Sequence, residues 1–335
     1  MKIGLAYDLK DTVISVPSCP EDALEEYDSP ETLNAIATVL QGLGHSTVKL
    51  GGGKEFITGI LQNNVDFVFN ISEGLGNHKS REAQVPSILE MLNIPYSGSD
   101  PQCLAICLDK PLTKILAAVA GVRTPKWHLI ADHSQLKETK CNDLPLPAFV
   151  KPAYEGSSKG IRIGSRAETA ARIAELAAEL LERYEQPVMV EEFIAGDEVT
   201  VGIVGNTPPN ILGIMRVLPR KGNADFIYSL EVKREWEQLV DYECPAQLEM
   251  GIMEEIKNSS LKVFKALGCR DFARLDFKLS PEGMPYFLEI NPLAGLNPKS
   301  SDLPIMANKL GRTYQTLISA ILNAALQRYP QCVRR

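Results

Sequence analysis

The sequence predicts a protein of the α/β and α+β classes with more than one lobe. Strand and helix signals alternate through the first third, beginning with Ile3–Tyr7, and such alternation is typical of a parallel sheet with crossover helices. From Trp127 onward the pattern changes to longer β runs around one strong helix, which is typical of an α+β lobe. The chain of 335 residues is longer than one compact core usually is. We therefore expect two or three lobes that share a cleft.

The elements of the first third have clear boundary signals. Ser29 is a helix N-cap followed by proline at the first helical position, and an apolar stripe runs from Leu33 to Leu40. A second helical stretch begins at Asp100-Pro101 and continues to about Ala120, but Pro111 interrupts it. Lys110 is therefore expected at a junction between lobes. The other predicted elements here are strands at Thr47–Leu50, Val65–Ile71 and Ile94–Tyr96, and a helix ending near Leu92.

The remaining elements follow from apolar periodicity. Ser165 and Glu168 form a capping box for a helix whose buried stripe runs from Ile173 to Leu181. The polar stretch from Gly222 to Asp241 has few core signals, and we expect a long mobile loop that covers a site. The other predictions are strands at Ala148–Lys151, Ile161–Ile163, Val188–Ile194, Val199–Val204 and Ile211–Leu218, a helix at Glu249–Leu267, and a helix near the C-terminus.

Composition and charge exclude several classes of function. Hydrophobic residues make up 44% and the net charge is -7, which argues against sequence-independent binding of nucleic acid or anionic membrane. The apolar run at the N-terminus ends at Asp8, too early for a signal peptide. We expect a cytoplasmic protein. The seven cysteines include no Cys-x-x-Cys pair, so neither zinc nor a disulfide framework is indicated, and Cys103 and Cys107 are interpreted as small core residues.

The segment from Arg274 to Pro292 predicts a β-hairpin with two different faces. A turn centred between Glu282 and Gly283 places Asp276 opposite Glu289 and Arg274 opposite Asn291. Two carboxylates and an amide oxygen beside an arginine are ligands that suit Mg²⁺. A solvated face with one ordinary ion pair is the alternative, and a one-residue bulge would spoil the register. The other face is expected to be apolar, with Leu275, Phe277, Leu279, Tyr286, Leu288 and Ile290.

Two further segments predict contacts with a nucleotide. Gly156 and Gly160 bracket two serines and a lysine, and such a loop can fold over polyphosphate because its backbone amides approach anionic oxygens closely. The strand Val188–Ile194 ends in an acidic turn, where backbone groups can meet an adenine edge and Glu198 can accept ribose hydroxyls. Each segment alone could be an ordinary turn. Their occurrence in one chain with the hairpin favours the nucleotide site.

These segments together resemble the ATP-grasp superfamily, and within it the D-alanine–D-alanine ligases. The likeness runs through LEMLNIPYSGSD, LDKPLTK, VKPAYEGSSKG, VEEFIAGDE, ARLDF and LEINPLAG. The resemblance implies a three-lobed fold that encloses ATP, with boundaries at 1–100, 101–195 and 196–335, and a homodimer. It implies that ATP contacts Lys110, Lys151, Gly156, Ser157, Ser158, Glu191, Ile194 and Glu198, that Mg²⁺ (or Mn²⁺) binds Asp276, Glu289 and Asn291, and that Arg274, Lys233 and Ser158 are catalytic.

The substrate end departs from the family pattern. Near the N-terminus the family has a glutamate in an E-x-x-[VI]-S context, whereas Tyr7–Asp11 shows nothing equivalent, so this anchor is missing or moved. The family's HGxxGEDG segment is replaced by Asn70–Pro86, and GLNPKSSDLP has one extra residue relative to the family's last substrate motif. Glu73, Gly295, Ser300 and Ser301 are the predicted substrate contacts.

The predicted function is therefore an ATP-dependent carboxylate–amine ligase that acts through an acyl-phosphate on amino acids or small peptides. A genuine D-alanine–D-alanine ligase is the first alternative. A nucleotide-binding sensor or scaffold without catalysis is the second, and Arg274 beside the predicted metal ligands argues against it.

Overall fold

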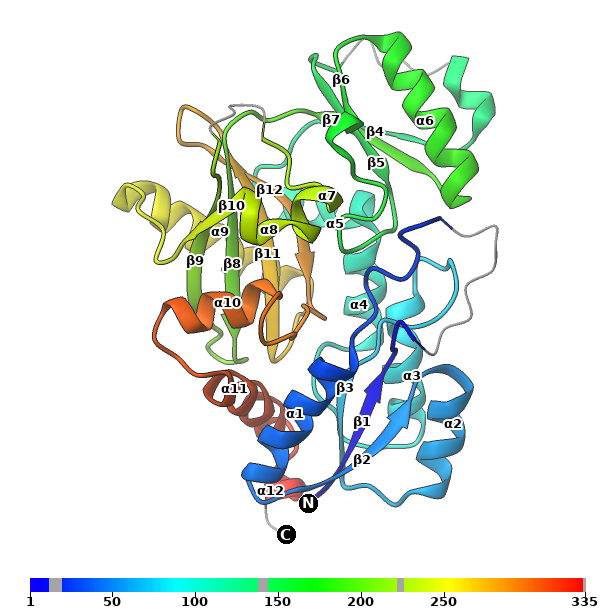
Figure 1. Ribbon diagram of the computed structural model, residues 1–335, viewed down its shortest axis with the longest axis vertical. Helices are drawn as coiled ribbons and strands as arrows, with labels where there is room; N and C mark the ends of the chain where they lie inside the picture. Colours follow the sequence, from blue (N-terminus) through cyan, green and yellow to red (C-terminus); the bar gives the residue numbers. More distant parts are fainter. Residues whose placement is uncertain (12–19, 138–143, 222–225, 334–335) are drawn as a thin grey trace.

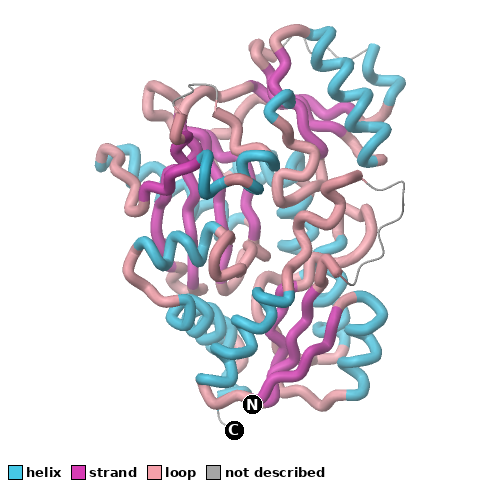
Figure 2. The backbone as a smooth tube through the Cα atoms, in the orientation of Figure 1, coloured by secondary structure: helices cyan, strands magenta, loops and turns pink. Residues whose placement is uncertain are grey.

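The computed structural model describes residues 1–11, 20–137, 144–221 and 226–333. Its strands form three separate sheets, which follow one another along the chain. Figures 1 and 2 show the first sheet and its helices at the bottom of the view, the second at the top, and the third on the left. The mixed α/β and α+β class is thereby confirmed. The lobe boundaries at residues 100 and 195 stay a prediction.

The first sheet is parallel, in the order β2-β1-β3. The N-cap of helix α1 is Ser29, which accepts a hydrogen bond from the Thr32 amide, as the sequence predicts. The strand expected at Ile94–Tyr96 is wrong, because only a single bridge joins Tyr96 to Val68. Pro95 has no amide hydrogen, so it cannot extend a ladder. The bounds are β1 Lys2–Tyr7, α1 Pro30–Gly42, β2 Ser46–Gly51, α2 Gly53–Gln62, β3 Phe67–Ile71, η1 Arg81–Ala83 and α3 Gln84–Met91.

Two helices connect the first sheet to the second. Asp109 separates them and caps the second helix by accepting a hydrogen bond from the Leu112 amide. Lys110 is the first residue of that helix, and its amide donates to the Ala153 carbonyl of the second sheet region. Lys110 therefore lies, as predicted, at a break between two helices that connect the first sheet to the second. The bounds are α4 Pro101–Leu108 and α5 Lys110–Val119.

The second sheet has the order β4-β7-β5-β6, and helix α6 packs on it. The expected capping box at Ser165 is wrong, because Thr169 caps this helix while Ser165 accepts a hydrogen bond from the Arg162 amide. The strand expected at Ile161–Ile163 is also wrong, because β6 forms a few residues later, against β5. The bounds are β4 Trp127–Ile130, η2 His133–Lys137, β5 Ala148–Pro152, η4 Ile163–Ser165, β6 Arg166–Ala167, α6 Ala170–Tyr184 and β7 Val188–Glu192.

The third sheet is antiparallel, in the order β10-β9-β8-β11-β12. Its two faces carry different clusters. Helix α9 buries Ile256, Val263 and Phe264 in one of them, whereas α10 packs on β9 on the opposite face. The bounds are β8 Asp197–Val204, β9 Asn210–Pro219, β10 Val240–Glu243, α9 Met250–Ala266, β11 Phe272–Leu279, β12 Pro285–Asn291 and α10 Asp302–Lys309.

The segment from Gly222 to Asp241 is not the structureless loop that its polarity predicts. It contains the short helices α7 (Leu230–Arg234) and α8 (Trp236–Leu239), and Ser229 caps the first of them. Leu230 and Val232 are 2% and 7% exposed. These two buried apolar side chains dock the helix. The polar composition of the whole segment gives no indication of them. Residues 222–225 lie outside the described residues.

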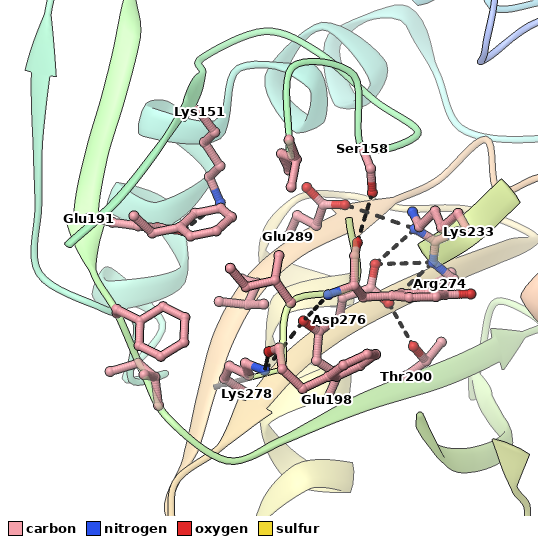
Figure 3. Close-up of a pocket in the computed structure, with 18 of the residues that line it drawn as sticks. Lys151, Ser158, Glu191, Glu198, Thr200, Lys233, Arg274, Asp276, Lys278 and Glu289 are labelled. Carbon is pink, nitrogen blue, oxygen red and sulfur yellow. Dashed lines mark hydrogen bonds and ion pairs between the residues drawn. The ribbon is translucent and has the colours of Figure 1, made fainter. Parts of the chain in front are cut away.

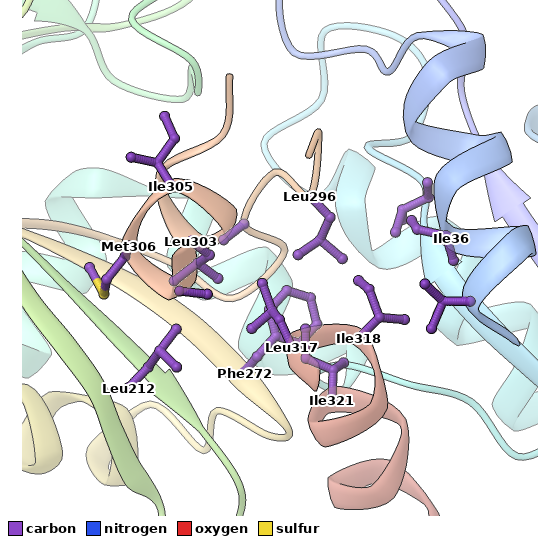
Figure 4. Close-up of a cluster of buried hydrophobic side chains, with 14 of the residues drawn as sticks. Ile36, Leu212, Phe272, Leu296, Leu303, Ile305, Met306, Leu317, Ile318 and Ile321 are labelled. Carbon is purple, nitrogen blue, oxygen red and sulfur yellow. The ribbon is translucent and has the colours of Figure 1, made fainter. Parts of the chain in front are cut away.

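The C-terminal helix α11 (Tyr314–Gln327) returns to the first lobe, where it packs against α1; α12 (Pro330–Val333) follows it. Figure 4 shows Ile318 and Ile321 of α11 beside Ile36 of α1, in one cluster with Phe272 of the third sheet. The sequence leaves open whether the apolar face of α1 is an interface or core. The structure shows that it is core.

Candidate active site

The hairpin of β11 and β12 forms the floor of the site, with the register that the sequence predicts at the key positions. Arg274 pairs with Asn291, and Asp276 pairs with Glu289. The turn lies about half a residue earlier than expected, because Leu279 pairs with Pro285. A bulge between Asp276 and Phe277 then restores the expected pairing from Asp276 onward, away from the turn.

That bulge changes the apolar face of the hairpin. Phe287 is fully buried, whereas Tyr286 and Leu288 are only partly buried and Leu288 lines the cavity. The prediction that Tyr286 and Leu288 belong to the core is therefore wrong. A bulge adds one residue to one strand, so the alternation of faces shifts by one position on the side nearer the turn.

The polar face of the hairpin holds a dense cluster of charges. A guanidinium nitrogen of Arg274 lies 2.8 Å from Asp276 Oδ2, and another lies 3.2 Å from Asp302 Oδ2. Lys110 Nζ lies 3.1 Å from Glu289 Oε2. Burial alone would raise the pKa of Glu289, but the surrounding cations outweigh it and hold that pKa well below its usual range. For Asp276 burial prevails, and its pKa is raised.

Three oxygen-bearing side chains converge on this face. Asn291 Nδ2 lies 3.4 Å from Asp276 Oδ2 and 3.5 Å from Glu289 Oε1. Two carboxylates and one amide make a hard donor set of the type that Mg²⁺ prefers. The residues therefore fit a divalent cation.

The first cavity lies between the second and third sheets, and Figure 3 shows its interior. Lys151 and Glu191 stand on one wall, facing the hairpin residues Arg274, Asp276 and Glu289. Glu191 is buried and binds two lysines, with 2.5 Å to Lys151 Nζ and 3.1 Å to Lys114 Nζ. The predicted residues that line this cavity are Lys151, Ser158, Glu191, Ile194, Glu198, Lys233, Arg274, Asp276 and Glu289.

The glycine loop and the segment of α7 meet over this cavity. Ser158 Oγ donates a hydrogen bond of 3.2 Å to the Tyr228 carbonyl, and the Leu230 amide donates to the Ile161 carbonyl at 3.1 Å. Ser157 and Ser158 both have left-handed backbone conformations, with φ of 50° and 59°, which are uncommon for residues other than glycine. The loop therefore keeps a strained shape while it contacts the opposite wall.

Sequence reasoning missed two buried lysines, one that lines the first cavity and one that pairs with Glu191 of its wall. Lys278 is buried, donates to the Phe226 carbonyl at 2.8 Å, and lies 3.4 Å from Glu198. Its position two residues after Asp276 on the same strand face is the signal that could have found it. Lys114 is fully buried, which lowers its pKa to about 8 although Glu191 opposes the shift.

The second cavity lies between the first lobe and the end of the hairpin. All the predicted substrate residues line it, namely Glu73, Gly295, Ser300 and Ser301, together with Lys110, Gly156, Ser157 and Asn291. The acidic residues Glu25, Glu26, Asp28 and Glu82 also line it. Carboxylates further along the chain than Tyr7–Asp11 therefore lie in the cavity that the predicted substrate residues line. Glu25 stands four residues before the N-cap Ser29, which is the spacing of the family pattern and the signal for finding it.

Arg274 and Glu289 line both cavities. The two cavities therefore adjoin at these two side chains. Arg274 is positively charged, and Glu289 is a predicted metal ligand. Among the described residues, no helix has the length and apolarity needed to cross a bilayer.

The three-sheet architecture is that of the ATP-grasp enzymes. A D-alanine–D-alanine ligase from Bacillus anthracis complexed with ATP superposes with a TM-score of 0.77 at 23% identity, covering 99% of both chains. The VanG D-Ala:D-Ser ligase from Enterococcus faecalis gives 0.70 at 21% identity, covering 97% of this chain and 99% of that one.

Sequence comparison then shows the family. A model described as "D-ala D-ala ligase C-terminus" matches residues 116–323. A D-alanine–D-alanine ligase of Aquifex aeolicus is 34% identical over 303 residues, covering 88% of this chain and 94% of its own. A protein of Sinorhizobium fredii called "Uncharacterized protein y4sG" is 30% identical over 304 residues, covering 88% of each chain. The chain belongs to the D-alanine–D-alanine ligase family, whose members are ADP-forming ATP-grasp ligases that use ATP.

Proposed function

We propose that this ligase joins the carboxyl group of an amino acid or small peptide to an amine, and that its substrates differ from two D-alanines. The observation that carries the proposal is that Arg274 and Glu289 line both cavities. A γ-phosphate that enters from the first cavity and a carboxylate held in the second would meet at these two residues.

The reaction then takes two steps. A carboxylate oxygen of the donor attacks the γ-phosphorus, the bond to ADP breaks, and an acyl-phosphate forms. The amine nitrogen next attacks the acyl carbon and displaces phosphate. We propose that Arg274 stabilises the negative charge that develops on the transferred phosphoryl group and on the acyl oxygen. Lys233, which lines the first cavity, and Ser158, which contacts its opposite wall, would act on the γ-phosphate side.

ATP binding is proposed for the residues that line the two cavities around the hairpin. Backbone amides of the glycine loop, at Gly156, Ser157 and Ser158, suit phosphate oxygens, and Lys110 and Lys151 add positive charge. Glu191 and Ile194 would stand beside adenine, and Glu198 beside ribose. Lys278, which lies 3.4 Å from Glu198, would hold that carboxylate in place.

Asp276, Glu289 and Asn291 would hold Mg²⁺, with Mn²⁺ as a substitute, and the cation would neutralise charge on the phosphates. Water must be excluded because acyl-phosphates hydrolyse readily. The contact between Ser158 and Tyr228 closes one side of the first cavity, which supports a role for the glycine loop and the α7 segment in this exclusion.

The substrate contacts support a donor other than D-alanine. Ser300 and Ser301 are proposed to bind a terminal carboxylate, and Gly295 lies so close to Ser301 that a Cβ there would be 2.8 Å from its hydroxyl oxygen. Glu73 and its acidic neighbours provide more negative charge than one ammonium group needs. This excess is the reason for proposing altered substrates.

The decisive experiment is a screen for ADP release. The protein is incubated with ATP, Mg²⁺ and D- and L-amino acids, alone and in pairs, and the products are identified by mass spectrometry. We expect ADP formation that depends on the amino acid and a product with a new amide bond. If D-alanine alone gives the fastest turnover, the chain is a D-alanine–D-alanine ligase. Tight ATP binding without ADP formation across the panel would instead favour a sensor.

Two further proposals concern the assembly and its location. The resemblance to the family supports a homodimer, which sedimentation velocity tests, and a cytoplasmic location. Fractionation of the producing cell would test the second proposal.

A further inference from the structure

The second cavity contains carboxylates that the protein itself neutralises and others that it does not. Glu26 lies 2.8 Å from Arg81 and 3.1 Å from Lys159. Glu155 binds the same two cations. Glu25 lies 2.5 Å from Arg234 and 3.4 Å from Lys10. These three carboxylates are therefore balanced.

Asp28, Glu73 and Glu82 are not balanced in this way. Among the described residues, none of the three has a cation within ion-pair distance, and only Asp28 receives a side-chain hydrogen bond, from Thr32. The cations that act on them have other partners. Arg81, which acts on Glu73 and Glu82, binds Glu26 and Glu155, whereas Lys110 binds Glu289 and Lys10, near Asp28, binds Glu25. The first-lobe side of the cavity is thus a surface of uncompensated negative charge.

Burial makes this arrangement costly in the absence of a ligand. Glu82 is only 9% exposed, and burial raises its pKa to about 7, while the nearby Arg81 opposes the shift. Burial likewise raises the pKa of Asp28 to about 7, and that of Glu73 well above its usual value. A buried carboxylate without a partner destabilises a fold by several kcal/mol. Glu82 is buried, and Asp28 and Glu73 are half-buried in the same cavity. This grouping indicates that a cation from outside supplies the missing charge.

A metal ion does not explain the three carboxylates. Within the described part of the chain, Cys103, Cys107 and Cys269 form the only group of three or more His, Cys, Asp or Glu side chains whose ligand atoms all lie within 4.8 Å of one another. The oxygens of Asp28, Glu73 and Glu82 are therefore too far apart for a single small cation. A longer organic cation with charges at separate points fits this spread.

The α-ammonium group of an ordinary amino acid would neutralise one of these carboxylates and leave the others unpaired. We infer that the second cavity takes an amino acid with a second cationic group, such as a diamino acid, and that this group binds among Asp28, Glu73 and Glu82. The inference rests on the proposed function, because the carboxyl group of that substrate must reach Arg274. It adds that the side chain of the substrate, rather than its α-carbon alone, is recognised by charge.

The test compares cationic amino acids with neutral ones of the same length. Lysine is paired with norleucine and ornithine with norvaline, in both configurations, and arginine is added. Binding is measured by calorimetry with a non-hydrolysable ATP analogue and Mg²⁺, and turnover is measured by ADP release. We expect at least one cationic member to bind and react at least tenfold better than its neutral partner. The same assays with 1,4-diaminobutane, with and without a neutral amino acid as donor, show whether a diamine is recognised as the amine acceptor instead.

Two variants assign the effect to the cavity. In Glu82→Gln and Glu73→Gln the ratio of cationic to neutral kcat/KM should fall at least tenfold. Glu182→Gln removes an exposed glutamate of α6 and should leave that ratio unchanged.

The outcomes separate the two proposals. Equal or better binding of norleucine and norvaline than of lysine and ornithine would overturn the dicationic substrate and leave the ligase proposal intact. Selective binding of a cationic amino acid without ADP release would support the dicationic ligand and overturn the ligase reaction. If none of the cationic probes binds, or if only the diamine is selected, the inference of a diamino acid is wrong.

Discussion

Arg81 binds Glu26 through two hydrogen bonds, with Nε 3.0 Å from Oε1 and Nη2 2.8 Å from Oε2. Lys159 of the glycine loop lies 3.1 Å from the same carboxylate. Glu26 precedes α1, Arg81 begins η1, and Lys159 belongs to the loop that contacts the first cavity's wall through Ser158. This buried network therefore joins the segment that lines the second cavity to the loop over the first. The position of the glycine loop and the shape of the second cavity therefore depend on the same side chains.

The first prediction concerns this network. Arg81→Met leaves Lys159 as the remaining cation beside Glu26 and Glu155, so we expect the free energy of unfolding to fall by about 3 kcal/mol or more, measured by urea titration. Arg183→Met is the control, because Arg183 makes an exposed ion pair of 3.8 Å with Glu179. It should cost less than about 1 kcal/mol. Equal losses for the two variants would show that the buried network does not stabilise the fold.

The second prediction concerns the cation site. Glu289→Gln removes one charge from the donor set and the partner of Lys110, so kcat for ADP release should fall by roughly 10² or more. Thr200→Val is the comparison, because it removes only the hydrogen bond of 3.0 Å that Thr200 donates to Asp276. It should have a smaller effect. Activity of Glu289→Gln within a few-fold of the wild type would remove Glu289 from the metal site.

The third prediction concerns pH and the unliganded protein. The pKa of Glu82 is about 7 in the folded state, above the value near 4.3 of an unfolded chain. The folded state therefore holds the proton more tightly, and the resulting stability is present below about pH 4.3 and is lost as pH rises through 7. The groups that act on Glu82 are Arg81, Glu26, Lys110, Cys103 and Glu73.

Glu82→Gln imitates the protonated carboxyl at every pH. Its Tm relative to the wild type should therefore rise between pH 5.5 and pH 8, by an amount equivalent to about 1 to 3 kcal/mol. The exposed variant Glu182→Gln should show no such trend. Parallel Tm curves for Glu82→Gln and the wild type would mean that the Glu82 carboxyl keeps an ordinary pKa.

The fourth prediction concerns the return of the C-terminal helix. Ile318 of α11 is fully buried in the cluster that includes Ile36 of α1. Ile318→Ala should cost about 2 to 5 kcal/mol, because it removes apolar contacts and leaves a cavity. Leu61→Ala, at a side chain that is 69% exposed, should change stability by less than about 0.5 kcal/mol. A loss below about 1 kcal/mol for Ile318→Ala would show that α11 does not tie the lobes together.

Much of the fold and of the first cavity can be predicted from the sequence. The Ser29 cap and the pairing of Asp276 with Glu289 depend on residues close to one another in the chain, so local pattern specifies them. The hairpin shows the limit of this reasoning. Its turn and its bulge deviate in opposite directions, so the polar face is predicted correctly while Leu288 is assigned to the wrong side. Packing against neighbouring strands and helices decides such a bulge, and no local signal marks it.

The second cavity shows what only the tertiary structure decided. Glu73 could be named from the sequence, but its grouping with Asp28, Glu82 and the distant Ser300 could not. Those residues reach one cavity because α11 packs on α1 and holds the first lobe against the end of β12. Hydrogen-bonding patterns within a helix, cap or hairpin depend on residues near one another in the chain, so they can be predicted from the sequence. Contacts between segments more than 200 residues apart arise from burial of apolar surface that many chain arrangements could satisfy, and the folded structure selects one of them.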